Sequence, residues 1–276
     1  MSKIKLIATD LDGTLIHDRK IHPIDRTIVK DVLSKNIPVM PATTRMRHSS
    51  SVLLKGLSIT KYPLICMNGA RVTGPGWDDY KSCNEWYETK LELNIAKDIS
   101  RYADKINCNI TTLYKEKKYW IKEDGQKLGQ HPEDPTAWLV ESNMDALTGE
   151  RPISYMVHSV RNDSRKMEQM YEYVKENHEL VRLDKHHRLG EWMAFTIYPK
   201  GTSKRNALDK VLDKLKLSIE DVLAIGDDEV DYELIKDAGI GIAMDDAPEH
   251  VKEIADDIAP SCTQQGFAWA ISKYII

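Results

Sequence analysis

The first and last thirds of the chain alternate strand-like apolar runs with amphipathic helical stretches, and this alternation restricts the fold more than any other feature. Residues 4–9 and 37–42 are strand-like and flank a helical stretch at residues 25–35. Near the other end, a helical stretch at residues 203–215 precedes the strand-like residues 222–225. Strands that alternate with helices form parallel sheets whose two faces the helices cover. The pattern therefore predicts an α/β core with a parallel sheet, built from both ends of the chain.

The middle of the chain has a different order of elements. A helical stretch at residues 91–106 is followed by strand-like residues 109–114 and 118–121, and a similar mixture of strands and a helix recurs from residue 153 onwards. A segment of this length with its own helices and strands is typical of a small domain inserted into a larger one. We therefore predict an inserted α/β domain at residues 84–192 and a core formed by residues 1–83 and 193–276.

Charge, hydropathy and cysteine spacing disfavour several classes of function. The formal net charge is −4, without any long run of lysine or arginine, so the chain lacks the electrostatic footprint of a protein that binds nucleic acid or an anionic membrane. No segment approaches a membrane span, and the apolar start is too short for a signal peptide. The four cysteines form no Cys-x-x-Cys pair, which disfavours a zinc cluster or a dithiol redox centre; they are Cys66, Cys83, Cys108 and Cys262. We expect a cytoplasmic monomer or small homo-oligomer whose partner is a small molecule.

Two aspartates, Asp10 and Asp12, directly follow the first predicted strand. Ligands of open α/β sheets bind at the carboxyl ends of strands, so these side chains emerge where a site would form. Asp10 can attack phosphorus as a nucleophile, while Asp12 can protonate the leaving alkoxide and later deprotonate water. A plain turn is the alternative, because aspartate and glycine suit turns. A calcium loop is excluded, since Leu15 and Ile21 stand where that loop requires glycine and glutamate.

A second acidic group, Gly-Asp-Asp-Glu-Val-Asp, occupies residues 226–231 and again follows a predicted strand. Together with Asp10 and Asp12, its carboxylates would form an oxygen-rich site of the kind that binds Mg²⁺. Without a cation, these carboxylates would repel one another and raise their own pKa values. The alternative is an acidic, solvent-exposed helix start, where aspartates are common.

These two groups resemble known motifs. Asp-x-Asp-Gly-Thr at residues 10–14 and Gly-Asp-x-x-x-Asp at residues 226–231 resemble motifs one and four of the haloacid dehalogenase superfamily, and the chain is most similar to its Cof-type sugar-phosphate phosphatases. The resemblance implies a Rossmann-like α/β core with an inserted α/β cap domain that selects the substrate. It also implies a magnesium-dependent phosphatase that forms an aspartyl-phosphate.

Two further segments fit the same family. Ala-Thr-Thr-Arg at residues 42–45 resembles Ala-Thr-Gly-Arg, whose threonine binds the phosphoryl group, and this implies that role for Thr43. Lys-Gly-Thr-Ser-Lys at residues 200–204 resembles motif three, whose last lysine neutralises the nucleophile and the transferring phosphoryl group, and this implies that role for Lys204. Asn68, which precedes a glycine, also matches a Cof-type feature, although such a pair is as often a plain turn.

The resemblance implies a role for each residue of the site. Asp10 is the nucleophile and Asp12 the acid and base. The metal ligands are Asp10, the main-chain oxygen of Asp12, and Asp227. The outer metal shell is supported by Asp228 and Asp231, with Asp231 alternatively supporting Lys204. Residues expected around the phosphoryl group are Leu11, Thr43, Thr44 and Lys204, and those expected to contact the rest of the substrate are Arg45 and Asn68.

Two positions depart from the family pattern. Thr44 stands in place of a glycine, and Val230 in place of the asparagine that usually precedes the last aspartate of motif four. Threonine brings a branched β-carbon where glycine permits close approach of the backbone. Valine lacks an amide to donate a hydrogen bond to a phosphate oxygen. We expect weaker or rearranged phosphate binding, with the catalytic and metal carboxylates intact.

The function predicted from these residues is Mg²⁺-dependent hydrolysis of a small phosphorylated metabolite, of the sugar-phosphate class, through an aspartyl-phosphate. A phosphomutase or phosphotransferase would use the same intermediate and transfer the phosphoryl group to a second hydroxyl. The sequence does not separate these two reactions. The alternative outside enzymes is a weakly active protein that binds a phosphorylated metabolite, and Thr44 and Val230 keep that alternative open.

Overall fold

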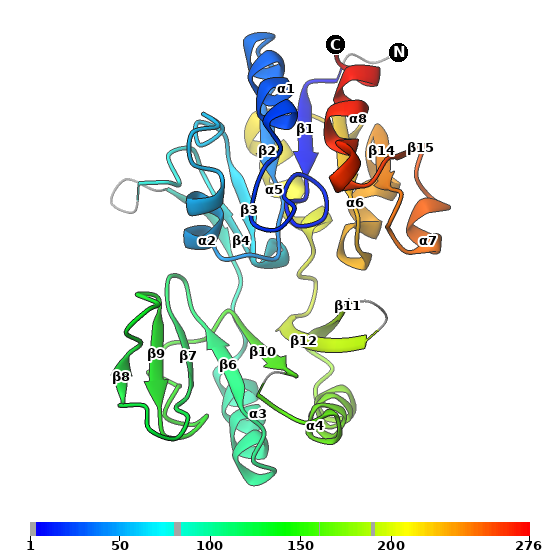
Figure 1. The fold of residues 1–276 in the computed structure, drawn as a ribbon. Coiled ribbons are helices and arrows are strands. Elements are labelled where there is room, and N and C mark those ends of the chain that lie inside the picture. The colour runs from blue at the N-terminus through cyan, green and yellow to red at the C-terminus, as the bar shows by residue number, and fades with distance from the viewer. Residues whose placement is uncertain (1–3, 80–83, 160, 189–190) are drawn as a thin grey trace. The chain divides into compact units, whose positions relative to one another are not determined.

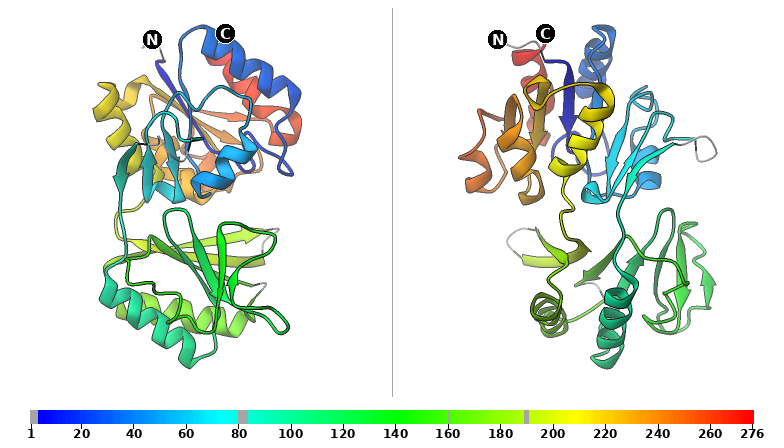
Figure 2. Two further views of the ribbon diagram at one scale, coloured as in Figure 1. Left: turned by 90° about the vertical axis from the view of Figure 1, so that its left-hand side faces the viewer. Right: turned by 180° about the vertical axis from the view of Figure 1, so that it is seen from behind.

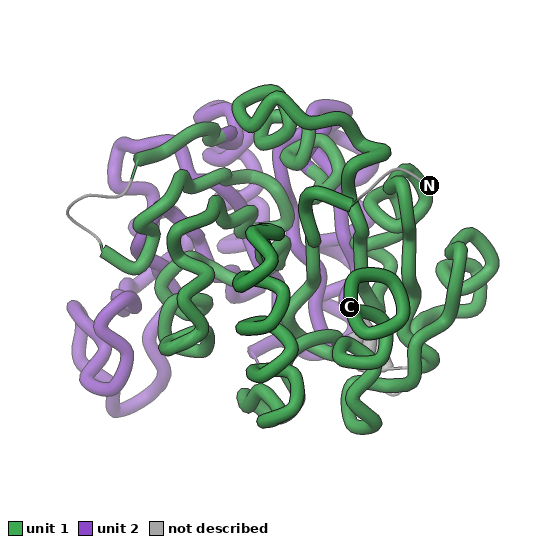
Figure 3. Tube along the Cα trace, turned by 90° about the horizontal axis from the view of Figure 1, so that it is seen from above, with its two compact units in different colours: residues 1–88, 203–276 green, residues 89–202 purple. Residues whose placement is uncertain are grey.

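The structure is a computed structural model that describes residues 4–79, 84–159, 161–188 and 191–276, with the side chains of residues 187, 188, 191 and 192 left out. The chain forms two compact units (Figures 1 and 3). Unit 1 contains Met1–Glu88 and Ser203–Ile276, and unit 2 contains Thr89–Thr202. Of the cysteines, Cys83 lies outside the described residues, and the other three are buried free thiols.

Unit 1 is built on a five-stranded sheet in the order β15-β14-β13-β1-β2. All four strand pairs are parallel. In sheet order the strands are β15 (Asp257–Ala259), β14 (Ile240–Met244), β13 (Val222–Gly226), β1 (Leu6–Thr9) and β2 (Val39–Pro41). This arrangement confirms the predicted parallel α/β core.

Helices cover both faces of this sheet. α1 (Pro23–Ser34) and α8 (Gly266–Tyr274) pack together on one face, and α5 (Lys204–Leu215) lies on the other (Figure 2). Ser203 begins α5 by accepting a hydrogen bond from the Asn206 amide, and Lys216 ends it in a left-handed conformation. Apolar side chains of α5 and of the sheet share one core cluster. The start of α5 is therefore held at the sheet.

Smaller elements complete unit 1. A three-stranded antiparallel sheet contains β3 (Leu64–Cys66), β4 (Arg71–Thr73) and β5 (Glu85–Glu88). Short helices follow several strands, and they are α2 (Arg47–Leu53), α6 (Tyr232–Asp237) and α7 (Glu249–Lys252). The 3-10 turns are η1 (Met67–Gly69), η2 (Ile219–Asp221), η3 (Glu229–Asp231) and η4 (Cys262–Gln264).

Unit 2 has a seven-stranded sheet with two helices on one face (Figure 2). Its strand pairs are antiparallel apart from β7 with β9. In sheet order the strands are β11 (Val181–Arg188), β12 (Glu191–Pro199), β10 (Ser154–His158), β6 (Ile110–Leu113), β7 (Lys118–Ile121), β9 (Ala137–Val140) and β8 (Gly129–Gln130). The helices α3 (Leu93–Lys105) and α4 (Ser164–Asn177) bury apolar stripes against the sheet.

The limits of the units follow the strand pairing. β12 stays paired with β11 as far as Pro199, so unit 2 extends beyond residue 192. At the other end, β5 pairs with β4 of unit 1 through Glu88. The role of residues 84–192 as a substrate-selecting cap stays a prediction. Among the described residues, no helix combines the length and the apolar character needed to cross a bilayer.

Candidate active site

The carboxyl ends of β1 and β13 bring two of the predicted motifs together. The strands pair in parallel with Thr9 opposite Ile225, and the Asp10 amide donates to the Ile225 carbonyl oxygen at 2.9 Å. Asp10 follows β1, and Asp227 follows β13. Although these aspartates are far apart in the sequence, the strand register therefore places them at neighbouring positions along one sheet edge.

Lys204 joins two of the carboxylates in a buried ion cluster. Its Nζ lies 2.5 Å from Asp10 Oδ1 and 2.7 Å from Asp231 Oδ1. Lys204 and Asp231 have no exposed surface, and Asp10 is only 6% exposed. Burial opposes the charged lysine, but the two carboxylates outweigh it and raise the Lys204 pKa above its ordinary value. Lys204 therefore remains a fixed positive charge beside Asp10.

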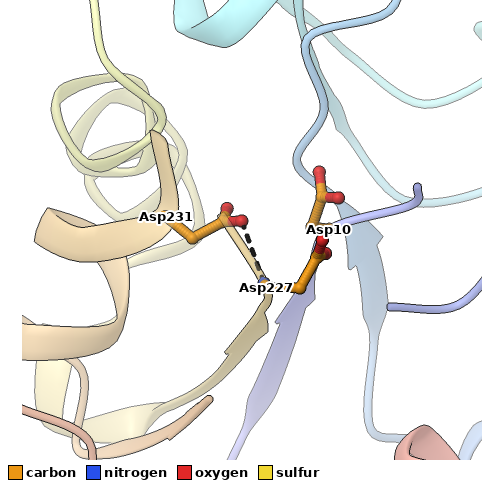
Figure 4. A group of neighbouring side chains, drawn as sticks. All are labelled: Asp10, Asp227 and Asp231. Carbon is orange, nitrogen blue, oxygen red and sulfur yellow. Dashed lines mark hydrogen bonds between the residues drawn. The ribbon is translucent and has the colours of Figure 1, made fainter. Parts of the chain in front are cut away.

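Asp10, Asp227 and Asp231 form a group of carboxylates whose nearest ligand oxygens all lie within 4.8 Å of one another (Figure 4). Burial, opposed by Lys204, raises the pKa of Asp10 to about 7. Burial, together with the charges of Asp10 and Asp231, raises the pKa of Asp227 well above its ordinary value. One lysine does not neutralise three carboxylates. An all-oxygen donor set with excess negative charge fits a hard divalent cation such as Mg²⁺.

The Gly13-Thr14 pair fits its loop closely against Asp227. Gly13 has φ +87°, and a β-carbon added to it would lie 2.1 Å from Asp227 Oδ2. The buried Thr14 hydroxyl donates to Asp227 Oδ1 at 2.6 Å. Glycine is required here both for the backbone conformation and for space, and threonine orients the carboxylate.

Asp231 also shapes the motif-four loop. While its Oδ1 accepts from Lys204, its Oδ2 accepts from the amides of Asp227 and Asp228 at 3.3 Å each; the first of these bonds is drawn in Figure 4. The Asp228 side chain accepts from the Glu229 amide at 2.7 Å and caps the short turn η3. Asp231 thus contacts both the lysine and the loop, whereas Asp228 is engaged within its own turn.

The Asp12 carboxylate is held by Arg45. Arg45 Nε lies 2.5 Å from Asp12 Oδ2, and its NH2 group lies 2.6 Å from Asp12 Oδ1, which is a bidentate ion pair. The hydrogen bonds that Arg45 donates to Asp12 contribute most to raising the Arg45 pKa. The sequence motif predicts that Arg45 contacts substrate, but it does not predict the pairing with Asp12. The signal was present, because β1 and β2 are neighbouring parallel strands and both residues follow their ends.

The other residues expected at the phosphoryl group have different surroundings. The fully buried Thr43 accepts a hydrogen bond from the Arg45 amide at 3.1 Å through its hydroxyl. The Leu11 side chain is buried, and the Leu11 backbone carbonyl oxygen accepts hydrogen bonds from backbone amides of the following turn. Thr44 is partly exposed, whereas Val230 is 7% exposed and largely packed away from solvent.

Asn68 lies in the tight turn η1, which is hydrogen-bonded to the segment after β2. Its φ is +53°, and its backbone N–H donates a hydrogen bond to the Thr43 carbonyl oxygen at 3.0 Å. The next residue, Gly69, has φ +91°, and a β-carbon there would meet the Ser203 carbonyl oxygen at 2.1 Å. Asn68 and Gly69 therefore form a turn. The turn contacts the segment after β2 on one side and the start of α5 on the other.

Comparison with known proteins gives matches along almost the whole chain. The sequence profile of the haloacid dehalogenase-like hydrolases matches residues 7–271. Stress response protein YhaX from Bacillus subtilis (strain 168) is 30% identical, over 99% of this chain and 94% of its own length. The 5-amino-6-(5-phospho-D-ribitylamino)uracil phosphatase YitU, from the same organism, is 28% identical over 99% and 98% of the two chains.

Solved structures match the fold. A haloacid dehalogenase-like hydrolase from Bacteroides thetaiotaomicron has a TM-score of 0.81 at 23% identity and covers 98% of this chain and 99% of its own. The haloacid dehalogenase subclass IIB sugar phosphatase BT4131 has a TM-score of 0.79 at 16% identity, with 98% of each chain covered. At sequence identities this low, the structural similarity shows a shared fold and nothing more specific.

Proposed function

Because the chain belongs to the haloacid dehalogenase-like hydrolases, we propose that it hydrolyses a small phosphorylated metabolite through an aspartyl-phosphate at Asp10, with Mg²⁺ as cofactor. The observation that carries this proposal is the buried cluster in which Lys204 contacts both Asp10 and Asp231 while Asp227 lies beside them. A nucleophilic carboxylate with a fixed cation and a cation-binding donor set is what attack on a phosphate dianion requires.

The proposed first step is in-line attack by a carboxylate oxygen of Asp10 on phosphorus. A bond forms between that oxygen and phosphorus, and the bond from phosphorus to the ester oxygen breaks. Asp12 donates its proton to the leaving alkoxide. In the second step Asp12 accepts a proton from water, and that water displaces the phosphoryl group from Asp10 as inorganic phosphate.

The other site residues assist these steps without forming bonds to phosphorus. Lys204 neutralises negative charge at Asp10 and at the transferring group. The metal would be held by Asp10, the Asp12 main-chain oxygen and Asp227, with Asp231 in support. When bound, Mg²⁺ supplies positive charge that lets a carboxylate approach a phosphate dianion. Thr43 is proposed to orient the phosphoryl group.

Arg45 adds a step specific to this arrangement. As long as its guanidinium donates hydrogen bonds to both oxygens of Asp12, the carboxylate is occupied by Arg45 and does not face a substrate oxygen. We propose that the substrate draws Arg45 away from Asp12, because an anionic substrate competes for the same donors. Asp12 then becomes available as acid, and Arg45 binds the substrate.

The names of two similar proteins suggest a class of substrate. YitU carries the name of a phosphatase of 5-amino-6-(5-phospho-D-ribitylamino)uracil, and BT4131 is described as a sugar phosphatase. We propose a phosphorylated sugar or sugar alcohol, with unit 2 as the substrate-selecting cap and the cytoplasm as the site of action.

Phosphate release tests this function. Purified protein with Mg²⁺ is expected to release inorganic phosphate from members of a panel of sugar and ribityl phosphates. Asp10→Asn is the control, because amide for carboxylate removes the nucleophile with little change of shape. Release in wild type and none in Asp10→Asn supports hydrolysis. Equal release by both proteins rejects Asp10 as the nucleophile. Binding without release favours the weakly active alternative.

A further inference from the structure

Unit 1 contains a cavity whose lining includes none of the residues assigned to the candidate active site. Its volume is about 620 Å³, in the range of about 300–1,000 Å³ that small-molecule sites occupy. Three segments form its wall: the chain at residues 17–21, the first turn of α1, and η4. The cavity is therefore a distinct feature of this unit.

The charge around the cavity is mainly positive. Arg19, Lys20 and Arg26 line it. Its two carboxylates differ in exposure: the Asp18 side chain is 84% exposed, with Oδ2 3.4 Å from His17 Nε2, whereas Asp25 accepts a hydrogen bond from the Ala268 backbone amide at 3.1 Å. Asp25 is also only 1% exposed. Three cationic side chains therefore line the cavity with one exposed carboxylate, and the excess positive charge attracts an anion.

The same cavity offers apolar surface. Ile21 and Cys262 are each 6% exposed, and Pro23 lies at the first position of α1. Pockets for organic ligands combine an apolar wall with a few polar groups that fix orientation. The occupant that fits this lining has an apolar body and an anionic group.

The cationic rim lies on a pre-formed turn. His17 and Lys20 exchange backbone hydrogen bonds of 2.9 Å in both directions. Between them, Asp18 and Arg19 have φ of +47° and +61°, which is the geometry of a two-residue hairpin turn. A backbone already closed into this turn lowers the entropy cost of binding.

We propose that this cavity binds a small organic anion, in which a phosphate or carboxylate group is joined to an apolar body, at a site separate from Asp10. The proposal rests on the cavity, its cations and its apolar wall, so it stands independently of the hydrolytic function. His17 and His22 both line the cavity, and their ring protons provide a local signal.

The test is NMR titration of the histidine ring protons, assigned with His17→Gln and His22→Gln, in the full-length protein. The probes are phenylphosphonate, which is not a phosphate ester, benzoate, and uncharged benzyl alcohol. Saturable shifts of both signals with at least one anion, but not with benzyl alcohol, are expected. The anion that binds more tightly identifies the preferred group.

A double variant, Arg19→Gln with Lys20→Gln, is expected to weaken this binding at least about tenfold, or ~1.4 kcal/mol. Lys30→Gln on the exposed side of the same helix is the matched control and should bind as wild type does. The proposal is overturned if neither anion shifts the two signals, if benzyl alcohol binds equally well, or if the double variant binds like Lys30→Gln.

Discussion

Lys204 Nζ lies 2.5 Å from Asp10 Oδ1, although the two residues are 194 positions apart in the chain. The contact arises because Asp10 directly follows β1 and Lys204 begins α5, the helix packed on one face of the same sheet. The proposed nucleophile is therefore neutralised by a lysine that is itself fully buried.

Removal of this lysine should inactivate the protein. Lys204→Met leaves the charges of Asp10 and the incoming phosphoryl group unopposed, so kcat is expected to fall about 10²–10³-fold, the usual cost of one electrostatic contact to a transition state. Initial rates of phosphate release measure this, with circular dichroism to check folding. Lys210→Met, an exposed position on the same helix, should retain full activity. A folded Lys204→Met protein with normal kcat would contradict the assigned role.

Magnesium should stabilise unit 1 through Asp227. Binding to the folded state alone adds about 2.7 kcal/mol when the ligand is at 100 times its Kd, and each kcal/mol raises Tm by about 2–4 °C in a domain of this size. Thermal unfolding with Mg²⁺ and with chelator measures the difference. Asp227→Asn should lose most of it. Asp245→Asn, an exposed carboxylate beyond the end of β14, should keep it. An unchanged Mg²⁺ effect in Asp227→Asn would move the metal elsewhere.

Replacement of Gly13 should be harmful because a side chain there would collide with Asp227. This steric effect can be measured separately from the strain of the positive φ. Gly13 and Gly56 have similar φ values, +87° and +84°, but a β-carbon at Gly56 would have nothing within 4 Å. Gly56→Ala should therefore cost only the strain of positive φ, about 1–2 kcal/mol. Gly13→Ala should cost more and also abolish the Mg²⁺-dependent rise in Tm, because Asp227 must move. Equal losses in both variants would show that only φ matters.

The proposed movement of Arg45 from Asp12 to the substrate predicts a difference between arginine and lysine. Arg45→Gln should lower kcat/KM about 10–100-fold, since a hydrogen bond to a charged group is worth about 1.5–3 kcal/mol. Arg45→Lys should recover only part of this loss, because an ammonium cannot form a bidentate pair with the anionic group of the substrate. Steady-state kinetics on the best substrate of the panel measures both variants. Full recovery by lysine would mean that charge alone is needed.

Asp25 should make stability depend on pH. Burial raises its pKa to about 6, against the opposing effects of the Ala268 amide and His22. A carboxyl whose folded pKa is raised stabilises the fold most below its unfolded pKa, and that stability is lost as pH rises through about 6. Asp25→Asn should therefore flatten the decline in unfolding free energy between about pH 4 and 7, by on the order of 1–3 kcal/mol. Asp31→Asn, exposed on the same helix, should leave the decline unchanged.

The sequence by itself determined the class of fold, the family and the residues worth examining. Strand and helix periodicity are local properties, so the alternation at both ends was enough to predict the parallel sheet, and the acidic motifs after its strands were enough to predict the family. Both predictions are confirmed. The roles given to the individual site residues remain predictions.

Only the tertiary structure decided which side chains meet. The Asp12–Arg45 pair depends on β1 and β2 being neighbours, and the clearance between Gly13 and Asp227 depends on the register of β1 with β13. The extent of unit 2 depends on how far β12 stays paired, and the cavity in unit 1 depends on η4 lying beside the first turn of α1. Such contacts join residues far apart in the chain. They follow from packing and strand register, which no local pattern of residues encodes.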